Sequence, residues 1–193
     1  AGHETTASAL TWAFYMLADR PHWLDRLRAE VSSVVGDAPL TFEHTRQLPL
    51  IKAFFKETLR LYPPITFMPR VALREATVAG RRLRKGALVM IAPWTLQRHS
   101  KWWPDPHAFK PERFLPEQEK TVAQGAYIPF GQGPHTCVGA GFAQTESVLI
   151  LAELARRFDW ILTPGQTVRP AARMTTRPVD QVTLHVRPQG SQG

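Results

Sequence analysis

The chain has 193 residues, of which 44% are hydrophobic and 21% charged, a composition typical of a globular protein and not of a disordered or fibrous one. Its 24 lysines and arginines outnumber 16 acidic residues and give a net charge of +8, but the basic residues are scattered and form no nucleic-acid-binding motif, so nucleic acid is not expected as a partner. One cysteine excludes an intramolecular disulfide, and no tract is long and apolar enough to span a bilayer.

The first 62 residues show the apolar periodicity of helices. They begin without a methionine, on a stretch typical of the middle of a helix, so we expect the chain to be the C-terminal part of a longer protein. A second helix is expected over residues 21–35, closed by Gly36, and a third from Pro49 to Tyr62. The first helix should cover residues 1–18, with its inner side formed by Leu10, Phe14, Leu17 and Ala18.

Two charged residues of the third helix stand three positions apart. Glu57 and Arg60 are therefore neighbours on the helix surface and can form an ion pair. The helical wheel places them at the edge of the apolar stripe, where such a pair is usually solvated and contributes little to stability.

Later stretches predict short strands and one more helix. Residues 67–91 combine β-rich pieces with Gly80 and Gly86, which predicts two or three strands. Residues 93–132 are rich in Pro, Trp and Phe without periodicity, so we expect an irregular segment held by aromatic burial. A helix over 138–158 and strands over 160–162 and 182–186 follow, and the fold class is mainly α with small β-sheets.

The only cysteine, Cys137, lies in a loop with Gly131 and Gly133 and opens the last helix. The helix dipole, and backbone N–H groups that glycine allows to approach, would both stabilise a thiolate there. Iron–sulfur clusters and structural zinc sites need several such ligands, and c-type haem needs a second cysteine. A lone thiolate can instead attack a substrate, as in a cysteine hydrolase, or serve as the single protein ligand of haem iron. A small buried side chain beside a turn is the third interpretation.

The spacing of this loop, Phe130-x-x-Gly133-x-His135-x-Cys137-x-Gly139, resembles the ligand loop of the cytochromes P-450, the haem-thiolate monooxygenases. Three other segments resemble signatures of that family in the same order: Ala1-Gly2-x-Glu4-Thr5, Glu57-x-x-Arg60 and Pro111-Glu112-Arg113-Phe114. The resemblance implies the C-terminal part of the cytochrome P-450 fold, from the second half of its distal helix to the C-terminus. Residues 1–193 would then be the C-terminal haem-binding part of a single domain whose N-terminal half is absent.

The cofactor implied by this resemblance is haem b, iron protoporphyrin IX. Cys137 corresponds to the ligand of the iron. Arg70 and His135 correspond to residues that hydrogen-bond the haem propionates, although arginine is commoner than histidine at the second position. Around the sulfur the resemblance places an aromatic ring and glycines that admit backbone donors, at Phe130, Gly131 and Gly139.

The resemblance also implies a distal site above the haem. Glu4 and Thr5 correspond to an acid–alcohol pair for proton delivery, on a helix where Gly2 leaves room for oxygen. Substrate-pocket positions correspond to Ala1, Ile65, Thr66, Phe67, Met68, Met174 and Thr175. Ordinary core packing is the alternative for residues 65–68.

A structural network is implied as well. Arg113 would join Glu57 and Arg60 in a buried cluster that is costly to break by removing one member. Gln97 and Ser100 depart from the commoner His and Pro of the family, a departure we expect to weaken only a supporting contact.

The implied activity is that of a monooxygenase, which inserts one atom of O2 into an organic, largely apolar substrate. Electrons would come from NAD(P)H through a ferredoxin, a flavodoxin or a reductase, and a basic surface suits such an acidic donor. We expect the isolated chain to be inactive. A bacterial-type enzyme would be cytoplasmic, and a membrane anchor in the missing part stays open.

Two alternatives belong to other classes. A non-catalytic haem-thiolate binder or sensor would keep the cysteine loop but has no need for the pair Glu4 and Thr5. A cysteine hydrolase could use Cys137 with His135, but the two are only two residues apart and no third residue is evident to orient the histidine.

Overall fold

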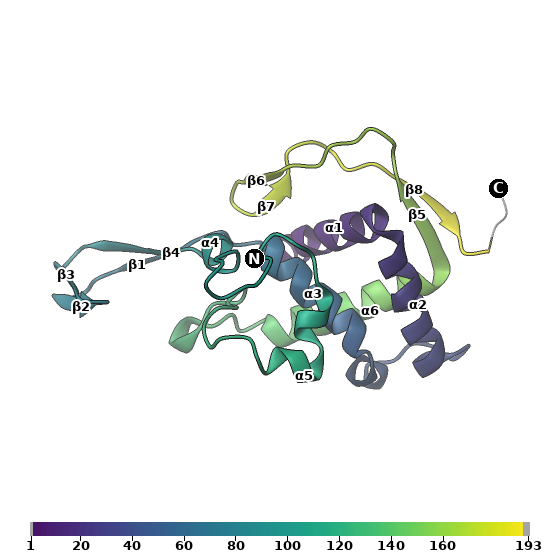
Figure 1. The fold of residues 1–193 in the computed structure, drawn as a ribbon, viewed down its shortest axis with the longest axis horizontal. Coiled ribbons are helices and arrows are strands. Elements are labelled where there is room, and N and C mark those ends of the chain that lie inside the picture. Colours follow the sequence, from purple (N-terminus) through teal and green to yellow (C-terminus); the bar gives the residue numbers. More distant parts are fainter. Residues whose placement is uncertain (1, 191–193) are drawn as a thin grey trace.

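The computed structural model describes residues 2–190 and shows a helical body with strands projecting from it (Figure 1). Among these residues the long helices are α1 (Glu4–Asp19), α2 (Pro21–Val35), α3 (Pro49–Leu61) and α6 (Ala140–Arg157). Two shorter helices, α4 (Pro93–Leu96) and α5 (Pro116–Glu119), and 3-10 turns at Glu43–Gln47, Pro111–Phe114 and Gly133–His135 lie between them. The predicted bounds of α2 agree with the structure, because a proline at its first position and Gly36 at φ +57° mark both ends.

One apolar core joins the four long helices. Leu17 of α1, Leu27 of α2, Phe54 of α3 and Leu151 of α6 are all fully buried in it. Burying one such side chain contributes about 1.5–3 kcal/mol, so this contact is the main source of stability for the helical body.

The buried side of α1 is wider than the sequence predicted. Leu10, Phe14 and Ala18 are only partly buried, whereas Trp12, Ala13 and Met16 are inaccessible. The reason is that α1 contacts α2, α3 and α6 and also β5 and β7, so more than one side of the helix is covered.

The start of α3 is capped from a neighbouring helix. The carboxylate of Glu30, on α2, accepts hydrogen bonds from the N–H groups of Leu50 (2.7 Å) and Ile51 (3.0 Å). Burial raises the pKa of Glu30, and these two hydrogen bonds oppose the rise. The cap satisfies N–H groups that have no partner within the helix and fixes the angle between α2 and α3.

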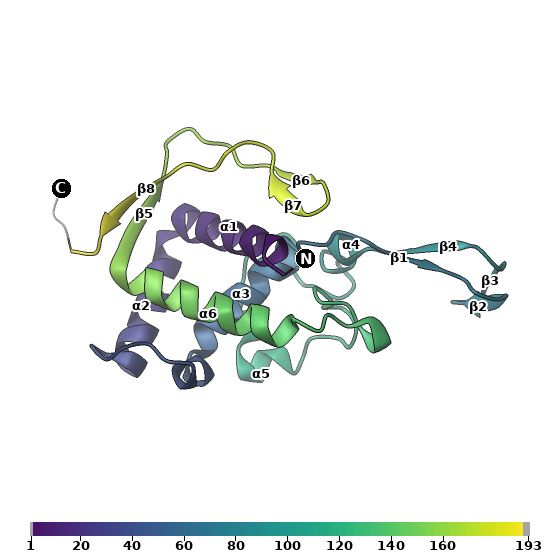
Figure 2. The ribbon, with the colours of Figure 1, turned by 180° about the vertical axis from the view of Figure 1, so that it is seen from behind.

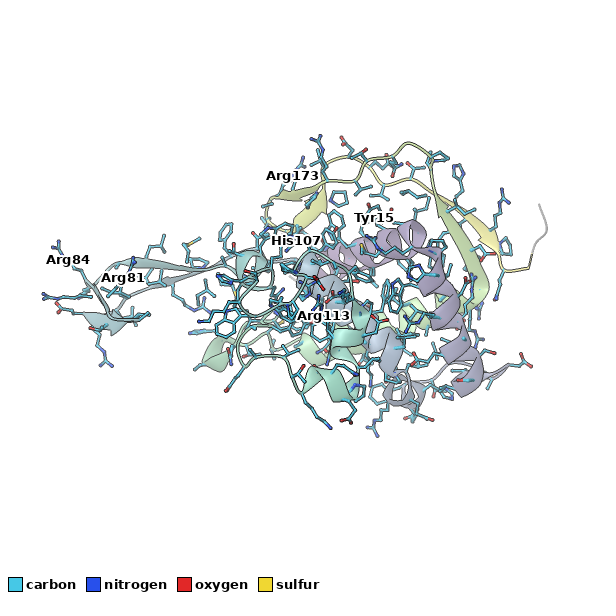
Figure 3. The ribbon with its side chains drawn as sticks, in the orientation of Figure 1. Tyr15, Arg81, Arg84, His107, Arg113 and Arg173 are labelled. Atoms are coloured by element: carbon cyan, nitrogen blue, oxygen red, sulfur yellow. The ribbon has the colours of Figure 1, made fainter. Side chains whose placement is uncertain are left out.

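Four short strands between α3 and α4 form two antiparallel pairs, where the sequence predicted two or three strands. The first pair is β1 (Met68–Val71) with β4 (Leu88–Ile91), and the second is β2 (Ala76–Val78) with β3 (Arg81–Leu83). Figures 1 and 2 show that they extend away from the helices, and Figure 3 labels Arg81 and Arg84 at the far tip.

The C-terminal segment crosses over α1 (Figures 1 and 2). Strand β5 (Phe158–Leu162) pairs with β8 (Leu184–Pro188), close to the two predicted strands. Between them lies a hairpin of β6 (Pro170–Ala172) and β7 (Thr176–Pro178), which the sequence did not predict because three-residue strands are too short to show alternation. No helix within residues 2–190 combines the length and the apolar character needed to cross a membrane.

Candidate functional site

The loop before α6 is shaped by backbone hydrogen bonds. The N–H of Gly131 donates to the carbonyl of Ile128 (3.0 Å), and the N–H of Cys137 donates to that of Phe130 (2.8 Å). Gly131 and Gly133 have φ of +76° and +75°, a conformation that other residues rarely adopt. The glycine spacing seen in the sequence therefore follows from the turn geometry that presents Cys137.

Cys137 is exposed and unpaired, and it stands before the helix and not at its first turn. The sequence predicted that it opens the helix, whereas α6 begins at Ala140, three residues after Cys137. A Cβ added at Gly139 would lie 3.9 Å from the Cys137 Sγ, so Gly139 lies directly beside the sulfur. The thiol therefore faces outward and is accessible to a ligand.

The surroundings of Cys137 are apolar and uncovered. Val138 is fully exposed, and Phe142 in the first turns of α6 is 72% exposed. Phe130 is partly buried and packs against the main core, which anchors the loop. Exposed apolar side chains beside an exposed thiol form a surface suited to a large apolar ligand.

Strand β1 brings two predicted residues to this loop. The Sδ of Met68 lies 3.6 Å from where a Cβ at Gly131 would be, so β1 passes beside the cysteine loop. Arg70 is two residues further on and thus on the same face of the strand as Met68. Among the described residues its guanidinium donates only to the neighbouring carbonyl of Pro69 (2.8 Å), and His135 is exposed on the loop itself. Two cationic or hydrogen-bonding groups are thereby available beside the apolar surface.

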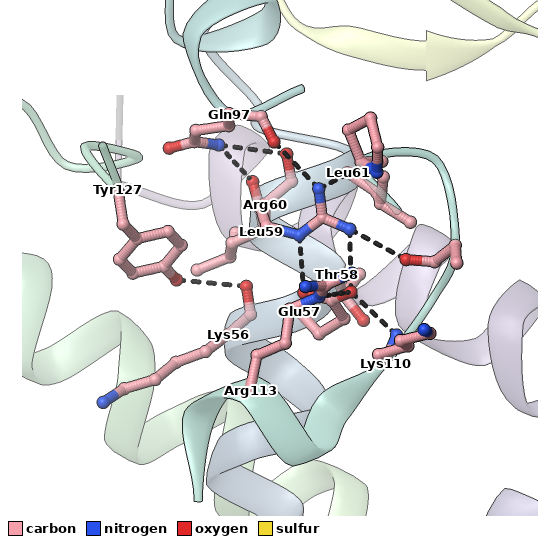
Figure 4. A network of polar contacts seen from close by, with 12 residues as sticks. Lys56, Glu57, Thr58, Leu59, Arg60, Leu61, Gln97, Lys110, Arg113 and Tyr127 are labelled. Carbon is pink, nitrogen blue, oxygen red and sulfur yellow. Dashed lines mark hydrogen bonds and ion pairs between the residues drawn. The ribbon is translucent and has the colours of Figure 1, made fainter. Parts of the chain in front are cut away.

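The predicted pair of Glu57 and Arg60 is fully buried (Figure 4), as the resemblance implied, and is not the solvated pair that the helical wheel alone suggested. The contact is bidentate, with Arg60 Nε 2.6 Å and Nη2 2.8 Å from the two carboxylate oxygens. Arg60 also donates to three backbone carbonyls, of Gln97 (2.8 Å), Pro106 (2.7 Å) and Ala108 (2.9 Å). All five N–H bonds of the guanidinium are thus used, and the irregular segment after α4 is fixed to α3.

Arg113 joins this pair by charge more than by hydrogen bonding. Its Nε lies 3.6 Å from Glu57 Oε1, while its Nη2 donates to the carbonyls of Pro104 and Asp105. Burial raises the pKa of Glu57, and the contact with Arg60 is the main effect opposing it. Burial also disfavours the charged form of Arg113 and therefore lowers its pKa. The three side chains come together as the sequence implied, with Arg113 at the partly exposed edge.

Gln97 is a residue whose importance the sequence did not reveal. It is fully buried, and its side-chain amide donates to the carbonyls of Leu59 (3.0 Å) and Arg60 (3.1 Å). Its Oε1 accepts from the N–H of Ile128 (2.9 Å), at the start of the cysteine loop. Gln97 therefore connects the end of α3, where Figure 4 shows its contacts with Leu59 and Arg60, to the N–H of Ile128 before the loop that carries Cys137.

The residues assigned to proton delivery lie at the first turn of α1. Glu4 is bound by the hairpin: its Oε1 lies 2.7 Å from Arg177 Nη2 and accepts from the Thr175 hydroxyl (3.2 Å). These two hydrogen bonds, that from Arg177 first, lower the pKa of Glu4. Thr5 is partly buried, and the carbonyl one turn before it belongs to Ala1, which lies outside the described residues.

The predicted pocket residues fall into two groups. Thr66 and Phe67 line a surface hollow together with Trp94, Pro170 and Thr176, so the segment before β1 meets the C-terminal hairpin. Ile65 and Met68 are partly buried beside it. At the tip of the hairpin Met174 is 84% exposed, whereas Thr175 is buried against Glu4.

Haem fits the residues around Cys137. Within the described part of the chain no group of three or more His, Cys, Asp or Glu side chains could hold a metal ion, so a metal bound by Cys137 needs its other donors from elsewhere. A porphyrin supplies four, offers a flat apolar face to Val138 and Phe142, and carries propionates for which Arg70 and His135 are available.

Comparisons with known proteins show what this chain is similar to. The family model described as Cytochrome P450 matches residues 1–186. The chain is similar to cyclooctatin synthase of Streptomyces melanosporofaciens, with 39% identity over 91% of this chain and 38% of that protein. It is similar to cytochrome P450 4A10 of Mus musculus, with 36% identity over 96% of this chain and 36% of that protein.

The fold also matches a solved structure, the crystal structure of a cytochrome P450DA heme domain. The TM-score is 0.91 at 32% identity, over 98% of this chain and 42% of that chain. The chain therefore spans less than half the length of the proteins to which it is similar.

Proposed function

Because this chain belongs to the cytochrome P450 family, we propose that it forms the haem-thiolate part of a monooxygenase that acts on a small organic, largely apolar substrate. The observation that carries this proposal is Cys137. It is an exposed thiol on a loop shaped by glycines and flanked by exposed apolar side chains, in a chain that matches the family over residues 1–186.

We further propose that residues 1–193 are the C-terminal, haem-binding part of one cytochrome P450 domain, whose N-terminal half is not in this chain. The support is coverage, since the chain matches 38% and 36% of two relatives. On this proposal the exposed apolar side chains of β1 and β4 meet that other half in the full-length enzyme, and the chain alone is inactive.

Each residue of the cysteine loop has a proposed role toward haem b. Cys137 gives its thiolate to the iron, and Arg70 and His135 hydrogen-bond the propionates. The ring of Phe130 packs beside the sulfur, and Gly131 and Gly139 leave space for backbone donors near it. When bound, haem supplies the activation of O2, which the electron-rich thiolate promotes.

Proton delivery is proposed for the first turn of α1. Glu4 carries protons between solvent and the distal pocket, and Thr5 passes them on and orients water there. Glu4 is 34% exposed and so remains in contact with solvent. Such a route argues for an enzyme and against a non-catalytic haem binder.

The substrate pocket is proposed to include the segment before β1 and the tip of the hairpin. Its residues are Ala1, Ile65, Thr66, Phe67, Met68, Met174 and Thr175. Their mainly apolar character favours a largely apolar substrate, and O2 is the second substrate.

Electrons come from NAD(P)H through a ferredoxin, a flavodoxin or a reductase, whose acidic surface would suit a chain of net charge +8. A cytoplasmic location is proposed if the enzyme is of the bacterial type.

Carbon monoxide added to the reduced full-length protein tests this proposal. Thiolate ligation gives the long-wavelength Soret band of the family, and Cys137→Ser removes that band because an alcohol is a poor ligand for iron. Val138→Ala, which changes the neighbouring exposed residue and keeps the thiol, serves as the control and retains the band. An unchanged band in Cys137→Ser contradicts the ligand assignment, and absence of haem from the wild type favours the hydrolase.

A further inference from the structure

One row of side chains on α1 connects that helix to the C-terminal hairpin. Glu4, Ser8 and Trp12 are spaced four residues apart and so lie on one face of the helix. Each of these three side chains contacts β7 or Thr175, the residue before β7. The Ser8 hydroxyl and the Trp12 indole N–H (2.9 Å) both donate to the carbonyl of Thr176, and Glu4 binds Thr175 and Arg177.

The hairpin is also hydrogen-bonded to the segment that follows α3. The N–H of Thr176 donates to the carbonyl of Pro64 (2.9 Å), and its hydroxyl donates to that of Pro63, both just after α3. Thr176 is almost completely buried. Because β7 is fixed to α1 and to the end of α3, the neighbouring side chains of Thr175 and Arg177 have defined positions relative to Glu4.

Three polar side chains close a triangle at the start of α1. Arg177 Nη2 lies 2.7 Å from Glu4 Oε1, Arg177 Nε donates to the Thr175 hydroxyl (3.1 Å), and that hydroxyl donates to Glu4 Oε1 (3.2 Å). Arg177 is 50% exposed, while Thr175 is buried. The triangle therefore extends from solvent to the interior at the residue to which proton delivery is assigned.

We propose that Arg177 is a positioning residue for Glu4: with Thr175 it holds the carboxylate ionised at the solvent side of α1, so that Glu4 takes up and passes on a proton only when this contact opens. The inference rests on the proposed function, since it gives the C-terminal hairpin control over the proton route. No bond other than a hydrogen bond is made or broken by Arg177. The proton comes from water, resides on a Glu4 carboxylate oxygen and leaves toward the distal pocket.

Electrostatics around Glu4 agree with this role. Hydrogen bonds from Arg177 and then from Thr175 lower the pKa of Glu4, partial burial opposes them, and the charge of Arg177 and that of nearby His3 add to the lowering. Within residues 2–190 these are the titratable groups acting on Glu4, one from β7 and one from the turn before α1. Removing the arginine therefore raises the pKa of Glu4.

The test compares Arg177→Met with Arg177→Lys in the full-length protein, and Arg173→Met is the matched control. Arg173 is an exposed arginine of the same hairpin (Figure 3) whose side chain makes no hydrogen bond or ion pair within the described residues. The first readout is independent of turnover. Glutamate labelled with carbon-13 at its carboxyl group is titrated by NMR in the diamagnetic reduced CO complex, and Glu4→Gln identifies the signal of Glu4.

We expect the titration midpoint of Glu4 to move to higher pH in Arg177→Met, to return part of the way in Arg177→Lys, and to stay in place in Arg173→Met. The second readout is coupling, the product formed per NAD(P)H consumed. Coupling should fall about tenfold in Arg177→Met at neutral pH, because a Glu4 carboxylate out of position transfers protons slowly. It should recover in part in Arg177→Lys.

Two results would overturn the proposal. One is a Glu4 midpoint that Arg177→Met leaves unchanged. The other is a coupling that falls equally in Arg177→Met and Arg177→Lys with no change in its pH profile, which indicates only a loosened hairpin. Failure of the proposed function gives a different result: the wild-type protein itself then lacks the long-wavelength Soret band of the reduced CO complex.

Discussion

Replacing Arg60 is expected to unfold the protein. Its guanidinium makes two hydrogen bonds to Glu57 and three to backbone carbonyls, and both charged side chains are inaccessible to solvent. Arg60→Met removes all five donors while keeping most of the side-chain volume. It leaves a buried carboxylate without its main partner and three carbonyls without theirs.

The magnitude follows from these contacts. Removing one member of a buried ion pair costs about 3–5 kcal/mol. Each buried carbonyl left without a donor adds about 1–3 kcal/mol where water cannot replace it. If water replaces none of the three donors, the total for Arg60→Met is about 6–14 kcal/mol, which is comparable to the whole stability of many proteins. Arg60→Lys offers three donors in place of five, so it should cost about 2–6 kcal/mol from the two or more contacts it loses.

Urea unfolding of the full-length variants, followed by circular dichroism, measures these costs. The control is Arg82→Met, because Arg82 and Glu75 form a bidentate pair of the same kind with side chains 74% and 56% exposed. That exposed pair should contribute little to stability, because water screens the two charges. If Arg60→Met is as stable as Arg82→Met, burial does not make the pair of Glu57 and Arg60 costly to break, and the reasoning is refuted.

Three further outcomes are expected. Thr5→Ala should lower the product formed per NAD(P)H consumed, measured against oxygen uptake, and equal coupling in variant and wild type would contradict its role in proton delivery. Gln97→Leu should destabilise the protein by about 3–9 kcal/mol in urea, because it leaves the N–H of Ile128 and two carbonyls of α3 without partners, and a change below about 0.5 kcal/mol would contradict the connecting role of Gln97. The pKa of Glu4 is lowered in the folded protein, so its ionised form contributes stability above its unfolded-state pKa and loses it as the pH falls through the folded-state value. Glu4→Gln should therefore destabilise the protein more at neutral pH than in acid, and a loss in urea that is independent of pH would refute this assignment.

Helices with clear ends could be predicted from the sequence. The bounds of α2 follow from Pro21 and Gly36, which act locally, and the run that forms α3 begins at Pro49. Cys137 was likewise found from its loop, since the glycines at positive φ leave a spacing that a sequence can show. Such features are determined by residues close in the chain.

Contacts between distant segments could not be predicted in the same way. The two ends of the Glu4 and Arg177 contact are 173 positions apart, and nothing near either residue indicates the other. Gln97 looked like a departure from a family pattern, yet its amide supplies donors and an acceptor in the geometry that α3 and the loop require. The burial of Glu57 and Arg60 was implied by the family resemblance and not by the helical wheel, because a wheel does not show which segment covers the helix edge.

The bond between the Cys137 sulfur and the haem iron is most directly tested by X-ray absorption at the iron K-edge of the full-length protein. We predict one sulfur in the first shell of the iron in the wild type and in Val138→Ala, and none in Cys137→Ser. A wild-type first shell that contains only nitrogen and oxygen would contradict this assignment.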